Sequence, residues 1–128
     1  VEPALLDPYR YSEELHAGNV GHVYSFGWCA DYPDPQNFLD VLFHSESPQN
    51  LGGYSNPEVD ALLEAARTEQ DAAARLDLYA QAEEMIIEDA PAAFVNHSLT
   101  AVLVKPYVKG YELTPLGIPQ WHRVTIDR

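Results

Sequence analysis

Residues 56–91 have the clearest structural pattern in the chain, and they read NPEVDALLEAARTEQDAAARLDLYAQAEEMIIEDAP. Asn56 followed by Pro57 is a typical helix start, because the asparagine oxygen caps free backbone amides and proline fits the first helical turn. The apolar residues that follow recur at helical spacing, at Val59, Leu62, Leu63 and Ala66. The sequence therefore predicts an amphipathic helix that begins at residue 57.

A second and longer helix is predicted to open at Asp71. Apolar and small residues line one side of it, at Ala72, Leu76, Tyr79, Ala82 and Ile86, and polar residues line the other side. This helix must end before Pro91, because the residue that precedes a proline is pushed out of the helical region of backbone space. These are the two main helices of the predicted fold.

Residues 27–35, which read GWCADYPDP, place an indole and an acid close together upstream of these helices. The residues just before them are rich in aromatic and β-branched side chains, and so predict a short strand over residues 22–28. Gly27 closes that strand, and a turn rich in proline and aspartate follows. Trp28 and Asp31 are then expected near a strand terminus, where mixed sheets usually place their ligands.

Asp31 is the first candidate for ligand binding. An ionised carboxylate at a cleft can pair with the α-ammonium group that every unmodified peptide carries. The same side chain could instead form an Asx turn, in which it accepts backbone amides ahead of Pro33. Trp28 also has two interpretations, an apolar wall for a ligand side chain or a buried indole that touches no ligand.

The rest of the chain predicts shorter elements. Asp34 before a proline indicates a capped short helix over residues 35–43, and residues 44–55 have the composition of a loop. Residues 1–20 predict a loosely organised lead-in with a short helical turn near residues 12–16. Apolar or β-branched runs beyond the second helix predict strands, at residues 92–95, 100–104 and 124–126. The predicted fold class is mixed α/β, with two main helices and short strands.

Composition argues against several function classes. The 128 residues include 20 acidic and 7 basic side chains, a net charge of −13, which disfavours nucleic acid as a partner. No apolar run approaches the ~20 residues that a membrane span requires. The histidines show no metal-binding spacing, at His16, His22, His44, His97 and His122. No nucleophile or hydrolase motif is present, so enzymatic activity is not expected. Neither a bound metal nor a cofactor is expected.

The single cysteine, Cys29, has two interpretations. A lone cysteine is most often a small buried hydrophobe, and the expected end of a strand would bury it easily. It could instead pair with a cysteine outside this chain in an oxidising compartment. The buried thiol is the favoured interpretation.

Four stretches in a fixed order carry a resemblance to a known family. They are GWCADYPDPQNFLD at 27–40, NLGGYSNPEVDALLEAA at 50–66, RLDLYAQAEEMIIEDAPAAFV at 75–95 and VKPYVKGYELTP at 104–115. Together they resemble the C-terminal part of the extracytoplasmic solute-binding proteins of ATP-driven oligopeptide, dipeptide and nickel importers, bacterial solute-binding protein family 5. The resemblance implies part of a two-lobed, type II periplasmic-binding-protein fold. It implies that residues 1–104 belong to the peptide-binding lobe and residues 105–128 return to the other lobe, with the N-terminal lobes absent from this chain.

The same resemblance implies a receptor without a cofactor that captures short peptides by main-chain hydrogen bonds and delivers them to the membrane subunits of an ABC importer. Asp31 of the intact GWxxD pattern would hold the peptide amino terminus, and the other implied ligand-binding residues are Gly27, Trp28, Cys29, Ala30, Asn50 and Tyr54. The implied location is periplasmic or extracytoplasmic and lipid-anchored in a bacterium, with membrane contact only through a missing anchor or the transporter. Alternatives are a receptor of the same fold for another solute, such as a nickel chelate or a sugar, and a sensor or regulatory module.

Overall fold

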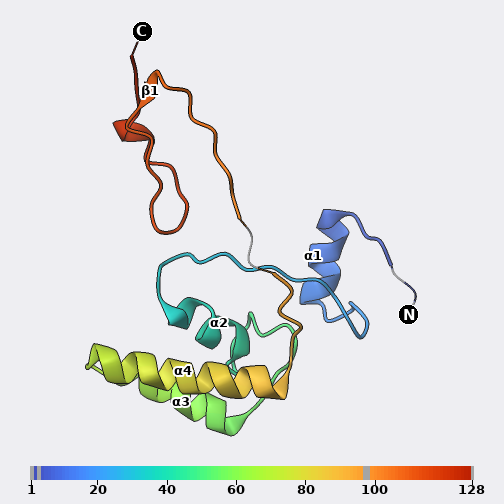
Figure 1. The fold of residues 1–128 in the computed structure, drawn as a ribbon. Coiled ribbons are helices and arrows are strands. Elements are labelled where there is room, and N and C mark those ends of the chain that lie inside the picture. The colour runs from blue at the N-terminus through green and yellow to red at the C-terminus, as the bar shows by residue number, and fades with distance from the viewer. Residues whose placement is uncertain (1, 3, 97–98, 128) are drawn as a thin grey trace.

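The computed structural model describes residues 2, 4–96 and 99–127, so that His97 of the histidine set lies outside the described residues. Four α-helices, two 3-10 turns and two short strands follow one another along these residues (Figure 1). In chain order they are α1 Pro8–His16, η1 Pro35–Asn37, α2 Leu39–Phe43, α3 Pro57–Thr68, α4 Ala72–Asp89, β1 Val108–Lys109, η2 Trp121–Arg123 and β2 Thr125–Ile126.

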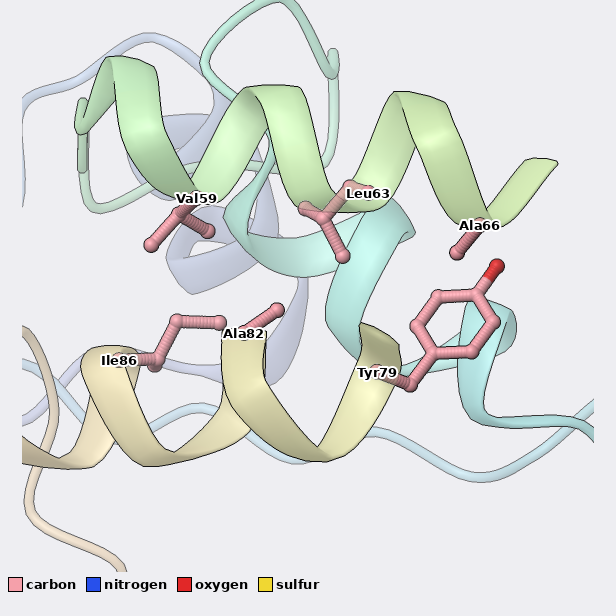
Figure 2. Packing of buried hydrophobic residues seen from close by; sticks show 6 residues of the cluster. All are labelled: Val59, Leu63, Ala66, Tyr79, Ala82 and Ile86. Carbon is pink, nitrogen blue, oxygen red and sulfur yellow. The ribbon is translucent and has the colours of Figure 1, made fainter. Parts of the chain in front are cut away.

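Helices α3 and α4 lie side by side and run in opposite directions (Figure 2). Their facing side chains form the hydrophobic core, made of Val59, Leu63 and Ala66 from α3 with Tyr79, Ala82 and Ile86 from α4. Each of these side chains is almost completely removed from water. Burial of apolar surface stabilises a fold by roughly 25 cal/mol per Å², so this helix pair is the main source of stability in the described residues.

The predicted helix boundaries are confirmed. Asn56 Oδ1 accepts a hydrogen bond from Glu58 N (3.0 Å) at the start of α3. Asp71 Oδ1 accepts from the backbone amides of Ala73 and Ala74 (3.0 and 2.9 Å) at the start of α4. Helix α4 ends at Asp89, and its C-cap Ala90 adopts a left-handed conformation (φ 50°) immediately before Pro91.

The predicted buried side of α4 is confirmed only from Tyr79 onward. Tyr79, Ala82 and Ile86 are buried, but Ala72 is exposed and Leu76 is 53% exposed. Helix α4 has 18 residues and α3 has 12, so the first turns of α4 extend beyond the surface that α3 can cover. Apolar periodicity indicates which face of a helix is buried and does not indicate where its packing partner ends.

The predicted strand over residues 22–28 is wrong. These residues have an irregular backbone, and Val23 and Phe26 are exposed. A strand needs a neighbouring strand to satisfy its backbone amides and carbonyls, and the one sheet of the described residues consists of β1 and β2. High β-propensity shows only that side chains would suit a pleated surface.

Two further strand predictions, over residues 92–95 and 100–104, are also wrong for the same reason. These residues are exposed, and Leu103 is completely so. The prediction for residues 124–126 is confirmed in part, because β2 pairs antiparallel with β1 in the register Val108 to Ile126 and Lys109 to Thr125.

The C-terminal strands form a small hairpin that lies apart from the helices, drawn in orange and red in Figure 1. An isolated bridge between Leu113 and Pro119 extends it, and the ring of Tyr111 meets that of Trp121 edge to face (5.8 Å between centroids). Gly110 has a φ of 70°, and a Cβ built on it would lie 2.1 Å from Arg123 O. Only glycine fits this position without a backbone shift.

The lead-in is more ordered than predicted, because α1 spans nine residues rather than a single turn. Asp7 precedes Pro8 and accepts from the amides of Tyr9 and Arg10, as an N-cap does. The hydroxyl of Tyr11 donates to Ser25 O, which ties α1 to the segment that leads to the GWCADYPDP stretch.

Candidate functional site

The side chain of Asn37 organises the stretch that the sequence singles out. Asn37 is only 2% exposed, and its Oδ1 accepts two hydrogen bonds from that stretch. One comes from Trp28 Nε1 (3.2 Å) and the other from Asp31 N (2.9 Å). One amide oxygen therefore joins the indole, nine residues away in the chain, to the backbone of the acid, six residues away.

Trp28 is half-buried. Its ring stacks on Phe26, with 6.3 Å between ring centroids and an interplanar angle of 26°. Its only polar atom is satisfied by Asn37, so the remainder of the indole presents apolar surface. Such a surface suits either of the two interpretations of Trp28.

The carboxylate of Asp31 is exposed. Among the hydrogen bonds of the described residues, Asp31 takes part through its backbone amide and not through its carboxylate. The Asx turn, in which the carboxylate accepts amides ahead of Pro33, is therefore not formed in the part of the chain that the structure describes. The arrangement leaves a fixed backbone with a free anionic group, which can accept a charge-assisted hydrogen bond from a cation.

Asp34 has the predicted capping role and a second role that the sequence did not indicate. Its Oδ1 accepts from Gln36 N (2.9 Å) at the start of η1. Arg75 of α4 also donates to both carboxylate oxygens (2.9 and 2.8 Å), and its guanidinium lies 4.9 Å from the centre of the Tyr79 ring. The hydrogen bond from Arg75 lowers the pKa of Asp34 below 3.8, and the same bond raises the pKa of Arg75.

A second arginine–aspartate pair holds the next element. Arg67 of α3 donates through Nε and Nη2 to the two oxygens of Asp40 in α2 (2.8 and 2.7 Å), and Asp40 is buried. This bond raises the pKa of Arg67. Bidentate pairs of this kind fix orientation as well as distance. The segment after the candidate site is thus fastened to both long helices, to α4 at Asp34 and to α3 at Asp40.

Asn50 and Tyr54 lie in the loop before α3, and the fold itself uses their polar atoms. Asn50 Nδ2 donates to Tyr54 O (2.7 Å) and His44 O (3.2 Å), and its Oδ1 accepts from Tyr54 N (3.0 Å). The Tyr54 hydroxyl donates to Asp89 at the end of α4 (2.6 Å). Burial, with a further contribution from Asp89, raises the pKa of Tyr54 to about 12. Their predicted contact with a ligand stays a prediction.

The remaining predicted ligand-binding residues surround Trp28. Gly27 and Cys29 are exposed and Ala30 is half-buried. The prediction of a buried thiol is wrong, because Cys29 is a free and exposed cysteine. The expected strand that would have buried it is not formed, and residues 22–28 instead run as irregular backbone.

Two other observations bear on function. Within residues 4–96 and 99–127, no group of histidine, cysteine and acidic side chains has the geometry to hold a metal ion. None of the helices in that part of the chain combines the length and the apolar character needed to cross a bilayer.

Comparisons with known proteins identify the relatives of this chain. The dipeptide-binding protein of Escherichia coli K12 is 32% identical over 129 residues, which cover 97% of this chain and 24% of that protein. The chain is homologous to periplasmic oligopeptide- and dipeptide-binding proteins. A solved structure of the periplasmic murein tripeptide-binding protein MppA, in its unliganded open form, matches 92% of this chain and 23% of its own with a TM-score of 0.59 and 27% identity. The fold is therefore that of part of a two-lobed periplasmic binding protein.

A relative with a different ligand also matches. Heme-binding protein A of Haemophilus influenzae is 36% identical over 104 residues, which cover 80% of this chain and 19% of that protein. No protein-family model matches the chain. The chain spans about a fifth to a quarter of the length of the relatives named here, all of which are binding proteins.

Proposed function

We propose that this chain is the C-terminal part of the substrate-binding component of an ABC-type peptide importer. The observation that carries the proposal is the exposed carboxylate of Asp31, which accepts no hydrogen bond from the described residues and lies on a backbone that Asn37 holds beside Trp28. The homologues include dipeptide- and oligopeptide-binding proteins, so a peptide is the ligand that best suits this anionic group.

Asp31 pairs with the α-ammonium group of the bound peptide in this proposal. Every unmodified peptide carries that group whatever its sequence, so the ion pair fixes the register of the peptide without reading its side chains. Main-chain hydrogen bonds to an extended peptide supply further affinity. The half-buried indole of Trp28 forms part of the wall around the first ligand residues, with Gly27, Cys29 and Ala30 beside it.

The wider assignments rest on the same homology. Residues 1–104 belong to the peptide-binding lobe, and residues 105–128 return to the other lobe, in keeping with a hairpin that lies apart from the helices (Figure 1). The receptor works outside the cytoplasm, held there by a lipid anchor or by the membrane subunits of the importer. It catalyses no reaction. Its 20 acidic side chains against 7 basic ones suit a protein that does not bind nucleic acid.

The experiment that tests the ion pair compares two forms of one peptide. The test uses the two-lobed receptor that contains this sequence. Asp31→Asn is expected to weaken the binding of a free peptide much more than the binding of the same peptide with an acetylated amino terminus, because the change removes only the partner of the ammonium group. Isothermal titration calorimetry measures both affinities. Asp77→Asn, an exposed acid on α4, is the matched control and is expected to alter neither. Equal losses for both peptides would reject the role of Asp31.

A second candidate ligand class is a non-peptide solute, which the match to heme-binding protein A favours. Mass spectrometry of receptor purified under mild conditions distinguishes the two classes. Co-purified short peptides would support the first proposal, and a co-purified haem or another non-peptide solute would support the second.

A further inference from the structure

We infer that Asn37 is the positioning residue of the ligand-binding stretch. Its side chain sets the relative placement of the Trp28 indole and the Asp31 backbone and does not itself pair with the ligand ammonium. This inference rests on the proposed function, in which Asp31 and Trp28 meet the peptide.

The orientation of the Asn37 amide follows from chemistry. Both neighbours of Oδ1 are N–H groups, the indole Nε1 of Trp28 and the backbone amide of Asp31. An N–H group can only donate, so the atom that meets both must be the oxygen and not the Nδ2 group. A rotated amide would place two donors against two donors. The assignment therefore does not depend on distinguishing oxygen from nitrogen in the side chain.

The burial of Asn37 shows that this contact is a built feature. Asparagine is usually exposed, and a buried amide is tolerated when it is hydrogen-bonded. Asn37 is 98% buried, yet it lies outside the apolar core of α3 and α4. Its oxygen serves two donors of the same loop and no other group among the hydrogen bonds of the described residues.

Asn37 is itself held in place from α4. It is the last residue of η1, and its backbone amide donates to Asp34 O (3.1 Å). Asp34 is clamped by the two hydrogen bonds from Arg75. The loop that carries Trp28 and Asp31 therefore takes its position from a long helix through this chain of contacts. A site held in this way loses less conformational freedom when a ligand binds, which is how preorganisation raises affinity.

Asn37→Leu tests this role, since leucine has a similar size and no acceptor. It leaves two N–H groups without a partner, and we expect peptide affinity to fall about tenfold or more. Asn37→Asp keeps an acceptor in the same place, so it is expected to restore most of the affinity. Calorimetry is carried out in the two-lobed receptor. Ile86→Ala, which opens a cavity in the core at the end of α4 opposite Arg75, is the control for a general loss of stability and is expected to bind as the parent does.

Tryptophan fluorescence gives a readout that does not need a ligand. This measurement is made on the 128-residue chain by itself, which has two tryptophans, so that with Trp121→Phe the emission reports on Trp28 alone. Asn37→Leu is expected to shift this emission to longer wavelength as the indole is released to water, and Asn37→Asp and Ile86→Ala are expected to leave it near the parent value. A shift of the Trp28 emission to longer wavelength in Asn37→Leu, together with weaker peptide binding, supports the inference.

The two proposals fail in different ways. If the parent receptor binds no peptide, the proposed function is wrong, and the emission shift alone decides whether Asn37 positions the loop. If the parent binds peptide and Asn37→Leu binds equally well or leaves the emission unchanged, the positioning role is overturned. If Asn37→Asp loses as much affinity as Asn37→Leu and its emission shifts as far, the acceptor role is wrong.

Discussion

Removing the guanidinium of Arg75 is expected to loosen the attachment of the candidate site to α4. Arg75 and Asp34 are 41 residues apart in the chain and are joined by hydrogen bonds of 2.9 and 2.8 Å. Their side chains are 26% and 31% exposed, which places the pair between a surface and a buried ion pair. The Arg75→Ala variant breaks this contact and also removes the stacking of the guanidinium on Tyr79.

The magnitude follows from the geometry and the exposure. A hydrogen bond to a charged group contributes about 1.5–3 kcal/mol when well shielded, whereas exposed ion pairs contribute about 0.2–1 kcal/mol. Partial exposure of Arg75 and Asp34 reduces the larger figure through solvent screening. We therefore expect a coupling energy of about 1–2 kcal/mol between the two side chains. The exposed pair of Arg123 and Glu112 has a similar distance of 2.7 Å and is the matched control, for which coupling below about 1 kcal/mol is expected.

The assay is a double-mutant cycle measured by urea unfolding of the chain. Asp34→Ala also removes the cap of η1, and the cycle cancels that separate loss because it appears in both arms. The pH dependence of the free energy of unfolding provides a second check. The pKa of Asp34 is lowered from 3.8 in the fold, so the contribution of the pair is fully present above about pH 3.8 and is lost as the pH falls through the folded value.

A coupling energy at neutral pH no larger than that of the Arg123 and Glu112 pair would show that Arg75 does not anchor Asp34. The same conclusion would follow if the stability difference between the parent and Arg75→Ala stayed constant as the pH falls below 3.8, since a protonated Asp34 no longer has a charge to pair.

Two further predictions concern the helical core and the hairpin. Leu63→Ala, at a fully buried position between α3 and α4, is expected to lower the free energy of unfolding by about 2–5 kcal/mol in urea titrations, and a loss under 1 kcal/mol would mean that the helix pair is not packed as described. Gly110→Ala is expected to disrupt the C-terminal hairpin, because its Cβ would lie 2.1 Å from Arg123 O at a φ of 70°, while an unchanged near-ultraviolet circular dichroism signal from Tyr111 and Trp121 would contradict that packing.

Local signals in the sequence are enough to predict α3 and α4. Asn56 and Asp71 are capping residues whose partners lie two or three positions along the chain, so a short window contains the whole interaction. The same signal, an aspartate before a proline, occurs at Asp7 and Pro8, where it predicts the start of α1. The helical turn predicted near residues 12–16 therefore lacks the first residues of α1, which this cap explains.

The strands and the anchoring of the site depend on contacts that no local window contains. Residues 22–28 have suitable side chains for a strand, but no neighbouring strand runs beside them among the described residues. Arg75 meets Asp34 only because α4 returns to the region that precedes α2, and nothing in the spacing of the two residues indicates that they pair. The role of Asn37 could not be predicted from a short stretch of sequence either. An asparagine in a turn usually suggests local turn chemistry rather than a buried acceptor for an indole.

The proposed function depends on the Asp31 carboxylate receiving the amino terminus of a peptide. A crystal structure of the two-lobed receptor with a bound di- or tripeptide decides whether it does. We expect the peptide nitrogen to lie about 2.7–2.9 Å from an Asp31 oxygen, with Trp28 and Asn37 still hydrogen-bonded beside it. A peptide whose ammonium group meets another acid, while Asp31 remains in solvent, would contradict it.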